Sequence, residues 1–185
     1  MPGIHVAKST IERYRVRHPR RPPPQIWKTF VTNHAEDIVA CDCFTVPTVT
    51  FDVLYGFVML SPDRREIIHF NVTDRPTAEW TTRQLVQAFP NDTAPRFLIR
   101  DNDSIYGEEF RQATANLNIR ELPIRPRTPV VNAYAEREIG TIRRECTDRV
   151  IVLNEEHLRK TLRQYVEYRN RNRTSVPDLA TPLAT

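Results

Sequence analysis

Three carboxylates in this chain have the residue type and the surroundings to hold metal ions: Asp42, Asp101 and Glu136. Asp42 lies inside the apolar stretch DIVACDCFTV, where an ionised acid is costly to bury unless it is paired or bound to a metal. Strand side chains alternate, so Asp42 points away from Cys41 and Cys43. The alternatives for Asp42 are a polar residue on a solvent face or a partner of a helix N-terminus. Two cysteines one residue apart, without a second pair, are a weak zinc signal.

Asp101 directly follows the apolar run FLIR, so it is expected at the carboxyl end of a buried strand, where open α/β sheets bind ligands. The following Asn102, Asp103 and Ser104 would equally suit an Asx turn, and this alternative stays open. Asp103 itself is given no role.

Glu136 falls in a predicted helix over residues 133–147, whose apolar stripe is Ala135, Ile139, Ile142 and Cys146. Projected at 100° per residue, Glu136 and Arg143 flank this stripe on one side, and Glu138 and Glu145 flank it on the other. The alternative is a solvated helix flank.

Carboxylates from two strands and a helix can form a site for two divalent ions, and hard oxygen ligands suit Mg²⁺ or Mn²⁺. Two such ions about 3.5–4 Å apart activate an attacking oxygen and stabilise a leaving oxygen on the same phosphorus. The chemistry indicated by these three residues is therefore cleavage or exchange of a phosphodiester bond.

The elements that position these acids can be predicted from hydrophobic periodicity. Strands are expected over 37–46, 53–60, 65–72, 96–100 and 118–124, and helices over 77–89, 107–117 and 133–147, with a last helix capped by Asn154. Three strands joined by short turns favour an antiparallel meander, and strands that alternate with helices favour parallel additions. The predicted fold is an α/β domain with a mixed five-stranded sheet flanked by helices.

Charge divides the chain unevenly. Of the 185 residues, 27 are Lys or Arg and 23 are Asp or Glu, and residues 1–30 alone carry a net charge of +6. A basic arm suggests binding to a polyanion, although charge alone also suits a solvated tail. The stretch 19–24, PRRPPP, predicts a stiff linker. With three cysteines, no secretory signal and no apolar run of membrane length, a cytoplasmic protein without a membrane partner is expected.

Three segments resemble one known family: IVACDCFTV, FLIRDNDSIYGEEF and RPRTPVVNAYAEREIGTIRREC. Together they are similar to the integrase catalytic core of bacterial insertion-element transposases and retroviral integrases, the Asp-Asp-Glu group with a ribonuclease-H-like fold. The likeness spans roughly residues 37–170. The 34 residues between Asp101 and Glu136 agree with the family gap of about 35. Glu138 is also near this spacing, but we prefer Glu136 because the helical projection places it beside Arg143.

The resemblance implies that Asp42, Asp101 and Glu136 are the catalytic residues and bind two Mg²⁺ or Mn²⁺ ions. It implies metal-dependent DNA cleavage that frees a 3′-OH, followed by attack of that hydroxyl on target DNA, without a covalent protein–DNA intermediate. The expected partners are DNA and further copies of the chain on that DNA, in a bacterial cytoplasm at the nucleoid, with no small-molecule cofactor. The residues expected to contact DNA are Asn132, Arg125, Arg127, Arg137, Arg143, Arg144, Lys8, Arg13, Arg15, Arg17, Arg20 and Arg21.

The expected organisation is a remnant of a helix-turn-helix DNA-binding segment over 1–18, a basic Pro-rich linker over 19–30, the catalytic core over 31–174 and a tail over 175–185. A helix-turn-helix needs helices before the one suggested at 8–15, so a truncated reading frame is expected. Two other functions stay open. The chain could be an inactive fragment that only binds nucleic acid, or a ribonuclease-H-like nuclease.

Overall fold

The structure, a computed structural model, describes residues 24–90, 93–123 and 133–173. Its centre is a five-stranded sheet formed by β1 (Ile38–Pro47), β2 (Val53–Ser61), β3 (Glu66–Thr73), β4 (Phe97–Arg100) and β5 (Arg120–Pro123). The strand order is β3-β2-β1-β4-β5. The first three strands pair antiparallel, and β4 and β5 add parallel to β1. The predicted mixed sheet and its five strands are confirmed.

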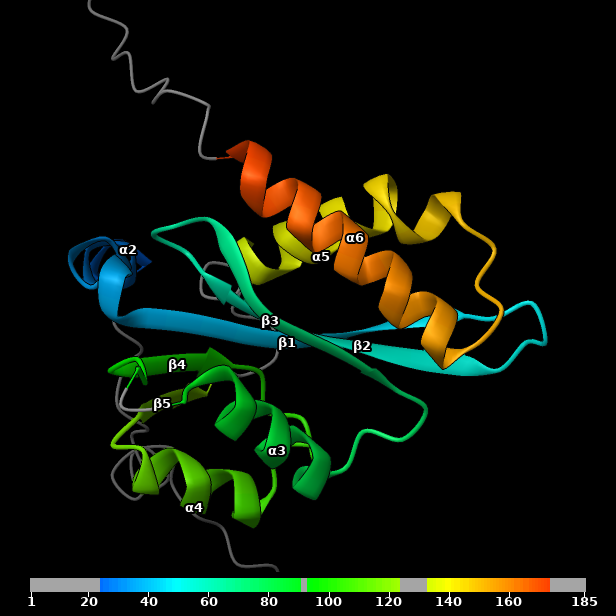
Figure 1. Ribbon diagram of the computed structural model, residues 1–185. Coiled ribbons are helices and arrows are strands. Elements are labelled where there is room, and N and C mark those ends of the chain that lie inside the picture. Colours follow the sequence, from blue (N-terminus) through cyan, green and yellow to red (C-terminus); the bar gives the residue numbers. More distant parts are fainter. Residues whose placement is uncertain (1–23, 91–92, 124–132, 174–185) are drawn as a thin grey trace, which may run out of the picture.

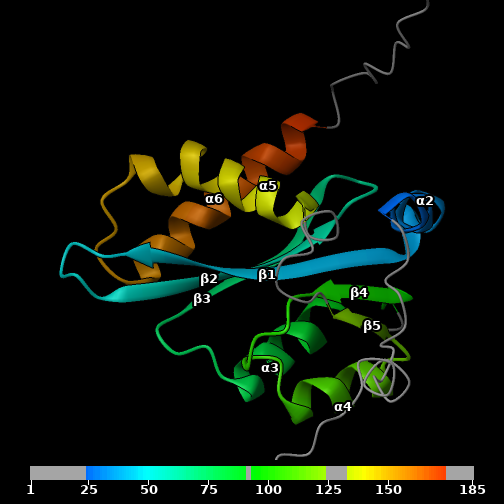
Figure 2. The same ribbon diagram turned by 180° about the vertical axis from the view of Figure 1, so that it is seen from behind.

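Helices cover both faces of this sheet. On one face lie α3 (Ala78–Ala88) and α4 (Glu108–Asn116), and on the other lie α5 (Ala133–Glu145) and α6 (Glu155–Arg173). The two views in Figures 1 and 2 show this three-layer arrangement from opposite sides. No described helix is long and apolar enough to cross a membrane.

Two apolar clusters fill the spaces between these layers. Strand alternation divides β1 between them: Ile38, Ala40, Phe44 and Val46 pack towards α5 and α6, whereas Val39 and Cys41 pack towards α3 and α4. A sheet covered on both faces explains why its strands read as nearly continuous apolar runs.

Local capping sets the start of two helices. The Thr77 hydroxyl accepts a hydrogen bond from the Trp80 N–H (3.2 Å) at the start of α3. The Asn154 side chain accepts one from the His157 N–H (2.9 Å) before α6, which confirms the predicted cap. The helix expected over 133–147 ends at Glu145 instead, because Cys146 leaves helical geometry (φ −124°, ψ −72°) and a short 3-10 helix, η2 (Thr147–Arg149), follows.

The sequence prediction missed the helix α2 (Pro24–Asn33). Residues 24–30 were expected in the Pro-rich linker, but proline is tolerated in the first turn of a helix, where its missing N–H breaks no bond. The ring of Phe30 packs edge-on against Phe97 of β4, with ring centroids 5.2 Å apart. This helix therefore belongs to the packed domain, with a short 3-10 helix, η1 (Ala35–Asp37), leading from it into β1. Residues 1–23 and 174–185 lie outside the described residues, and the division of the chain stays a prediction there.

Candidate active site

Asp42 lies in the middle of β1, on the sheet face that α5 and α6 cover. It shares this face with Ala40 and Phe44, which are buried in the cluster beneath α5. Its own side chain is half-buried, and its Oδ1 accepts a hydrogen bond from the N–H of Cys43 (2.8 Å). The predicted alternation is confirmed, because Cys41 belongs to the opposite cluster.

Asp101 directly follows the carboxyl end of β4, the strand that pairs with β1. Ala40 and Ile99 are partners in the parallel ladder, so the two aspartates follow at equivalent positions, each two residues further along, on the same face. The sequence expectation for the end of this strand is therefore correct.

The surroundings of Asp101 disfavour its charge. Burial raises the pKa of Asp101, and the nearby charge of Asp103 raises it further. A hydrogen bond that the Asp103 N–H donates to Asp101 Oδ1 (3.3 Å) acts in the opposite direction and lowers this pKa. That hydrogen bond is also the Asx-type turn that the sequence left open. A half-buried carboxylate with another acid, Asp103, nearby suits a hard divalent cation, which would compensate the negative charge.

The structure distinguishes the two candidate glutamates of α5. Glu138 is buried and forms an ion pair with Arg169 of α6, whereas Glu136 is exposed. Glu145, on the same flank as Glu138, accepts a hydrogen bond from the Tyr165 hydroxyl of α6 (2.8 Å). The flank with Glu138 therefore faces α6. As the helical projection predicted, Glu136 lies on the other flank, where it is available to a ligand.

Within the described residues, no group of three Asp, Glu, His or Cys side chains is close enough together to hold a metal ion. Asp42 and Asp101 occupy equivalent positions on β1 and after β4, and Glu136 lies in the first turn of a helix on the same face of the sheet. The segment that leads into this helix, residues 124–132, is outside the described residues. The assignment of the three acids as metal ligands thus stays a prediction.

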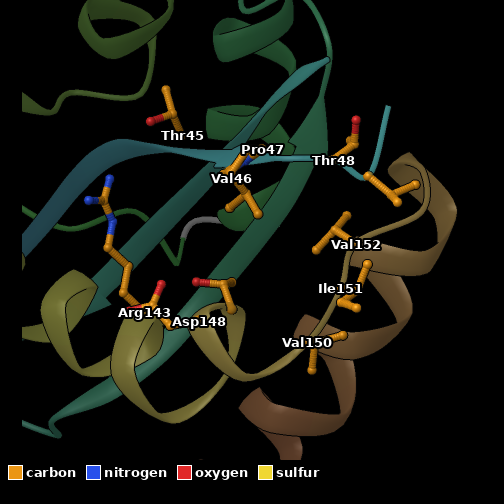
Figure 3. Close-up of a pocket in the computed structure, with 11 residues that line it drawn as sticks. Thr45, Val46, Pro47, Thr48, Arg143, Asp148, Val150, Ile151 and Val152 are labelled. Atoms are coloured by element: carbon orange, nitrogen blue, oxygen red, sulfur yellow. The ribbon is translucent and has the colours of Figure 1, made fainter. Parts of the chain in front are cut away.

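Three arginines of α5 are exposed: Arg137, Arg143 and Arg144. Arg143 lines a cavity of about 480 Å³ between α5, η2 and the carboxyl end of β1. Figure 3 shows the residues that line it. Asp148 and Thr45 add polar atoms to its lining, and Val150, Ile151 and Val152 form an apolar wall. The other residues expected to contact DNA lie outside the described residues: Lys8, Arg13, Arg15, Arg17, Arg20, Arg21, Arg125, Arg127 and Asn132.

A buried arginine, Arg100, lies directly before Asp101 and was not predicted as part of the site. Arg100, the last residue of β4, is 3% exposed and pairs with Glu121 of β5. The available signal was a cation at the end of the apolar run FLIR, directly before the candidate ligand Asp101.

The three cysteines, whose role the sequence left unassigned, are free thiols, and Cys41 and Cys146 are buried.

Comparison with known proteins supports the fold deduced above. Residues 117–174 match the family model of the integrase core domain, a segment that includes Glu136. The catalytic domain of the Mos1 mariner transposase superposes with a TM-score of 0.63 at 13% identity, covering 90% of this chain and 85% of that one. The same domain in a structure with raltegravir and Mg gives a TM-score of 0.58 at 14% identity, covering 78% of each chain. No curated protein was found to match the chain.

A viral structure is also similar. A chain of the simian T-cell lymphotropic virus intasome, determined in complex with PP2A regulatory subunit B56 gamma, superposes with a TM-score of 0.58 at 17% identity. The match covers 81% of this chain and 60% of the viral one, so this chain spans less than two thirds of that relative.

The fold is thus that of the ribonuclease-H-like catalytic domains of integrases and transposases. The match of residues 117–174 to the integrase core domain agrees with the family resemblance seen in the sequence.

Proposed function

We propose that this chain is a transposase or integrase catalytic core that cuts and joins DNA strands with the help of divalent metal ions. The observation that supports the proposal is that Asp42 and Asp101 occupy equivalent positions on the neighbouring strands β1 and β4, with Glu136 exposed on the helix that covers the same face. The integrase core domain match over 117–174 supports the same function.

The proposed metal ligands are Asp42, Asp101 and Glu136. Two bound Mg²⁺ or Mn²⁺ ions would lower the pKa of an attacking hydroxyl and stabilise the charge on the leaving oxygen. In the first reaction, water attacks the phosphorus and the bond from phosphorus to the 3′ oxygen breaks. In the second, the freed 3′-OH attacks a phosphorus of target DNA, and a new phosphodiester forms as the target's own 3′ oxygen leaves. The Mos1 catalytic domain has a structure with Mg, which supports a divalent cofactor here.

The proposed partner is DNA that runs along α5. Arg143 lies two helical turns after Glu136, about 10 Å along the helix axis, and its guanidinium could bind a phosphate near the cleaved bond. Arg137 and Arg144 lie exposed on the same helix, and Asn132, Arg125 and Arg127 precede it. The basic arm that contains Lys8 to Arg21 would add contacts without sequence specificity. We further propose a homo-oligomer, because joining two DNA ends requires two active sites, in a bacterial cytoplasm at the nucleoid.

The test compares variants of the acids with a control on the same helix. With Mn²⁺ and supercoiled plasmid, the unmodified chain should produce nicked and joined DNA, and Asp42→Asn and Glu136→Gln should produce neither. Glu145→Gln is the control, because Glu145 is exposed on α5 and its amide replacement can still accept the Tyr165 hydrogen bond.

Three outcomes separate the alternatives. Equal nicking by all variants would refute the assignment of the acids. DNA binding without any cleavage by the unmodified chain would indicate a fragment that only binds. Cleavage of the RNA strand in an RNA–DNA hybrid, without joined DNA products, would indicate a nuclease.

A further inference from the structure

The residues that precede the two aspartates meet on the opposite face of the sheet. Cys41 precedes Asp42 and Arg100 precedes Asp101, so alternation directs both side chains towards α4. There they contact one side chain, Tyr106, which is 1% exposed. The Cys41 thiol donates a hydrogen bond to the Tyr106 hydroxyl (3.7 Å), and the Arg100 guanidinium lies over the Tyr106 ring, 5.2 Å from its centroid.

Arg100 is held from several directions at once. Its Nε donates to Glu121 Oε2 (2.6 Å), its Nη2 pairs with the same carboxylate, and its Nη1 donates to the backbone carbonyl of Asp101 (2.8 Å). Thr114 of α4 donates to the other oxygen of Glu121 (2.5 Å). Because the guanidinium is a rigid planar fork, these bonds fix its orientation and with it the backbone at Asp101.

The contacts through Tyr106 link β1 and β4 beyond the end of their hydrogen-bonded ladder. The parallel ladder between β1 and β4 ends at the pair Ala40 and Ile99, so both aspartates lie just beyond the last ladder partners. Without another link, nothing in the ladder would set their separation. Tyr106 spans the two strands at this level, and its N–H also donates to the Asp103 carbonyl (3.2 Å), which closes the turn after Asp101.

We propose that Arg100 and Tyr106 are positioning residues that hold Asp42 and Asp101 at the separation needed to share metal ions. This inference rests on the proposed function, because it assigns these two aspartates as ligands. A role in stability alone would not call for a buried charge, since apolar residues of similar volume can replace a buried ion pair with little loss of stability. Partners of metal ligands typically change metal affinity by about 10–100-fold when they are removed.

The principal variant replaces both members of the buried pair, Arg100→Met together with Glu121→Met, so that no unpaired charge stays in the core. The matched control is Arg111→Met together with Glu108→Met, which removes an exposed ion pair from α4. Two properties are measured: Mn²⁺ affinity, from the electron paramagnetic resonance signal of free Mn²⁺, and hydrogen exchange of the Asp103 and Tyr106 amides without metal.

We expect the principal variant to bind Mn²⁺ about 10-fold more weakly and to exchange these amides faster, whereas the control changes neither. Unchanged affinity and unchanged exchange in a folded principal variant would overturn the inference. If that variant does not fold, Tyr106→Phe tests the inference instead. It keeps the ring and the ion pair and removes only the hydroxyl that accepts the hydrogen bond from the Cys41 thiol. It should weaken Mn²⁺ binding in the same direction by a smaller factor, and unchanged Mn²⁺ binding and exchange in it would equally overturn the inference.

The proposed function and this inference can fail separately. An unmodified chain that binds no Mn²⁺ would refute the proposed metal site. Amide exchange would then still decide whether Arg100 and Tyr106 hold the turn after Asp101.

Discussion

The buried ion pair between Glu138 and Arg169 gives a direct test of which glutamate of α5 is structural. The two side chains are 4% and 5% exposed, so water solvates neither charge. Removing one member of a buried pair costs about 3–5 kcal/mol, because the remaining charge stays buried. In a chain of this length, 1 kcal/mol shifts Tm by about 2–4 °C, so Glu138→Gln should lower Tm by roughly 6–20 °C.

Glu136→Gln is the comparison, since Glu136 lies on the same helix but is exposed. Exposed substitutions usually change stability by about 0.5 kcal/mol or less, which predicts a Tm shift of about 2 °C or less. Thermal unfolding followed by circular dichroism measures both variants. Glu138→Met combined with Arg169→Met should recover most of the loss, because it leaves no unpaired charge. Equal Tm values for Glu138→Gln and Glu136→Gln would refute the distinction between a structural Glu138 and an exposed Glu136.

Three further predictions concern the rest of the fold. Gly56→Ala should lower the free energy of unfolding, measured in urea, by about 1–3 kcal/mol, because its Cβ would lie 2.5 Å from the buried ring of Phe44. Gly140→Ala on α5 should raise it by up to about 1 kcal/mol, because the new Cβ meets only the flexible end of an arginine side chain. Burial lowers the pKa of His69, so its contribution to stability is present above about pH 6.5 and is lost as the pH falls below that value. His69→Gln should therefore make the free energy of unfolding less dependent on pH below about pH 6.5. Identical pH profiles of stability for the variant and the unmodified chain would contradict this. Burial raises the pKa of every thiol, so iodoacetamide at pH 8 should alkylate the native chain far more slowly than the unfolded chain, as measured by mass spectrometry, at Cys41, Cys43 and Cys146.

Hydrophobic periodicity was sufficient to predict the five strands and the helices that follow them. A strand such as β1, buried on both faces, reads as a continuous apolar run, and a helix such as α6 shows its apolar stripe and its Asn154 cap in the sequence. Local signals failed at α2, where a Pro-rich stretch indicated a linker. Its helix packs through Phe30 against Phe97, a contact 67 residues away that no local window contains.

The candidate site shows the same division. The sequence predicted Asp42 inside β1, pointing away from Cys41 and Cys43, and Asp101 at the carboxyl end of β4. Their common face depends on the register between β1 and β4, which only the folded sheet determines. The sequence favoured Glu136 over Glu138 through the helical projection, although both flank the apolar stripe of α5. The burial of Glu138 against Arg169 depends on the packing of α6, which no local pattern contains. The link from Arg100 through Tyr106 to Cys41 also depended on tertiary structure, because those residues come together only when β1, β4 and the segment before α4 are folded against one another.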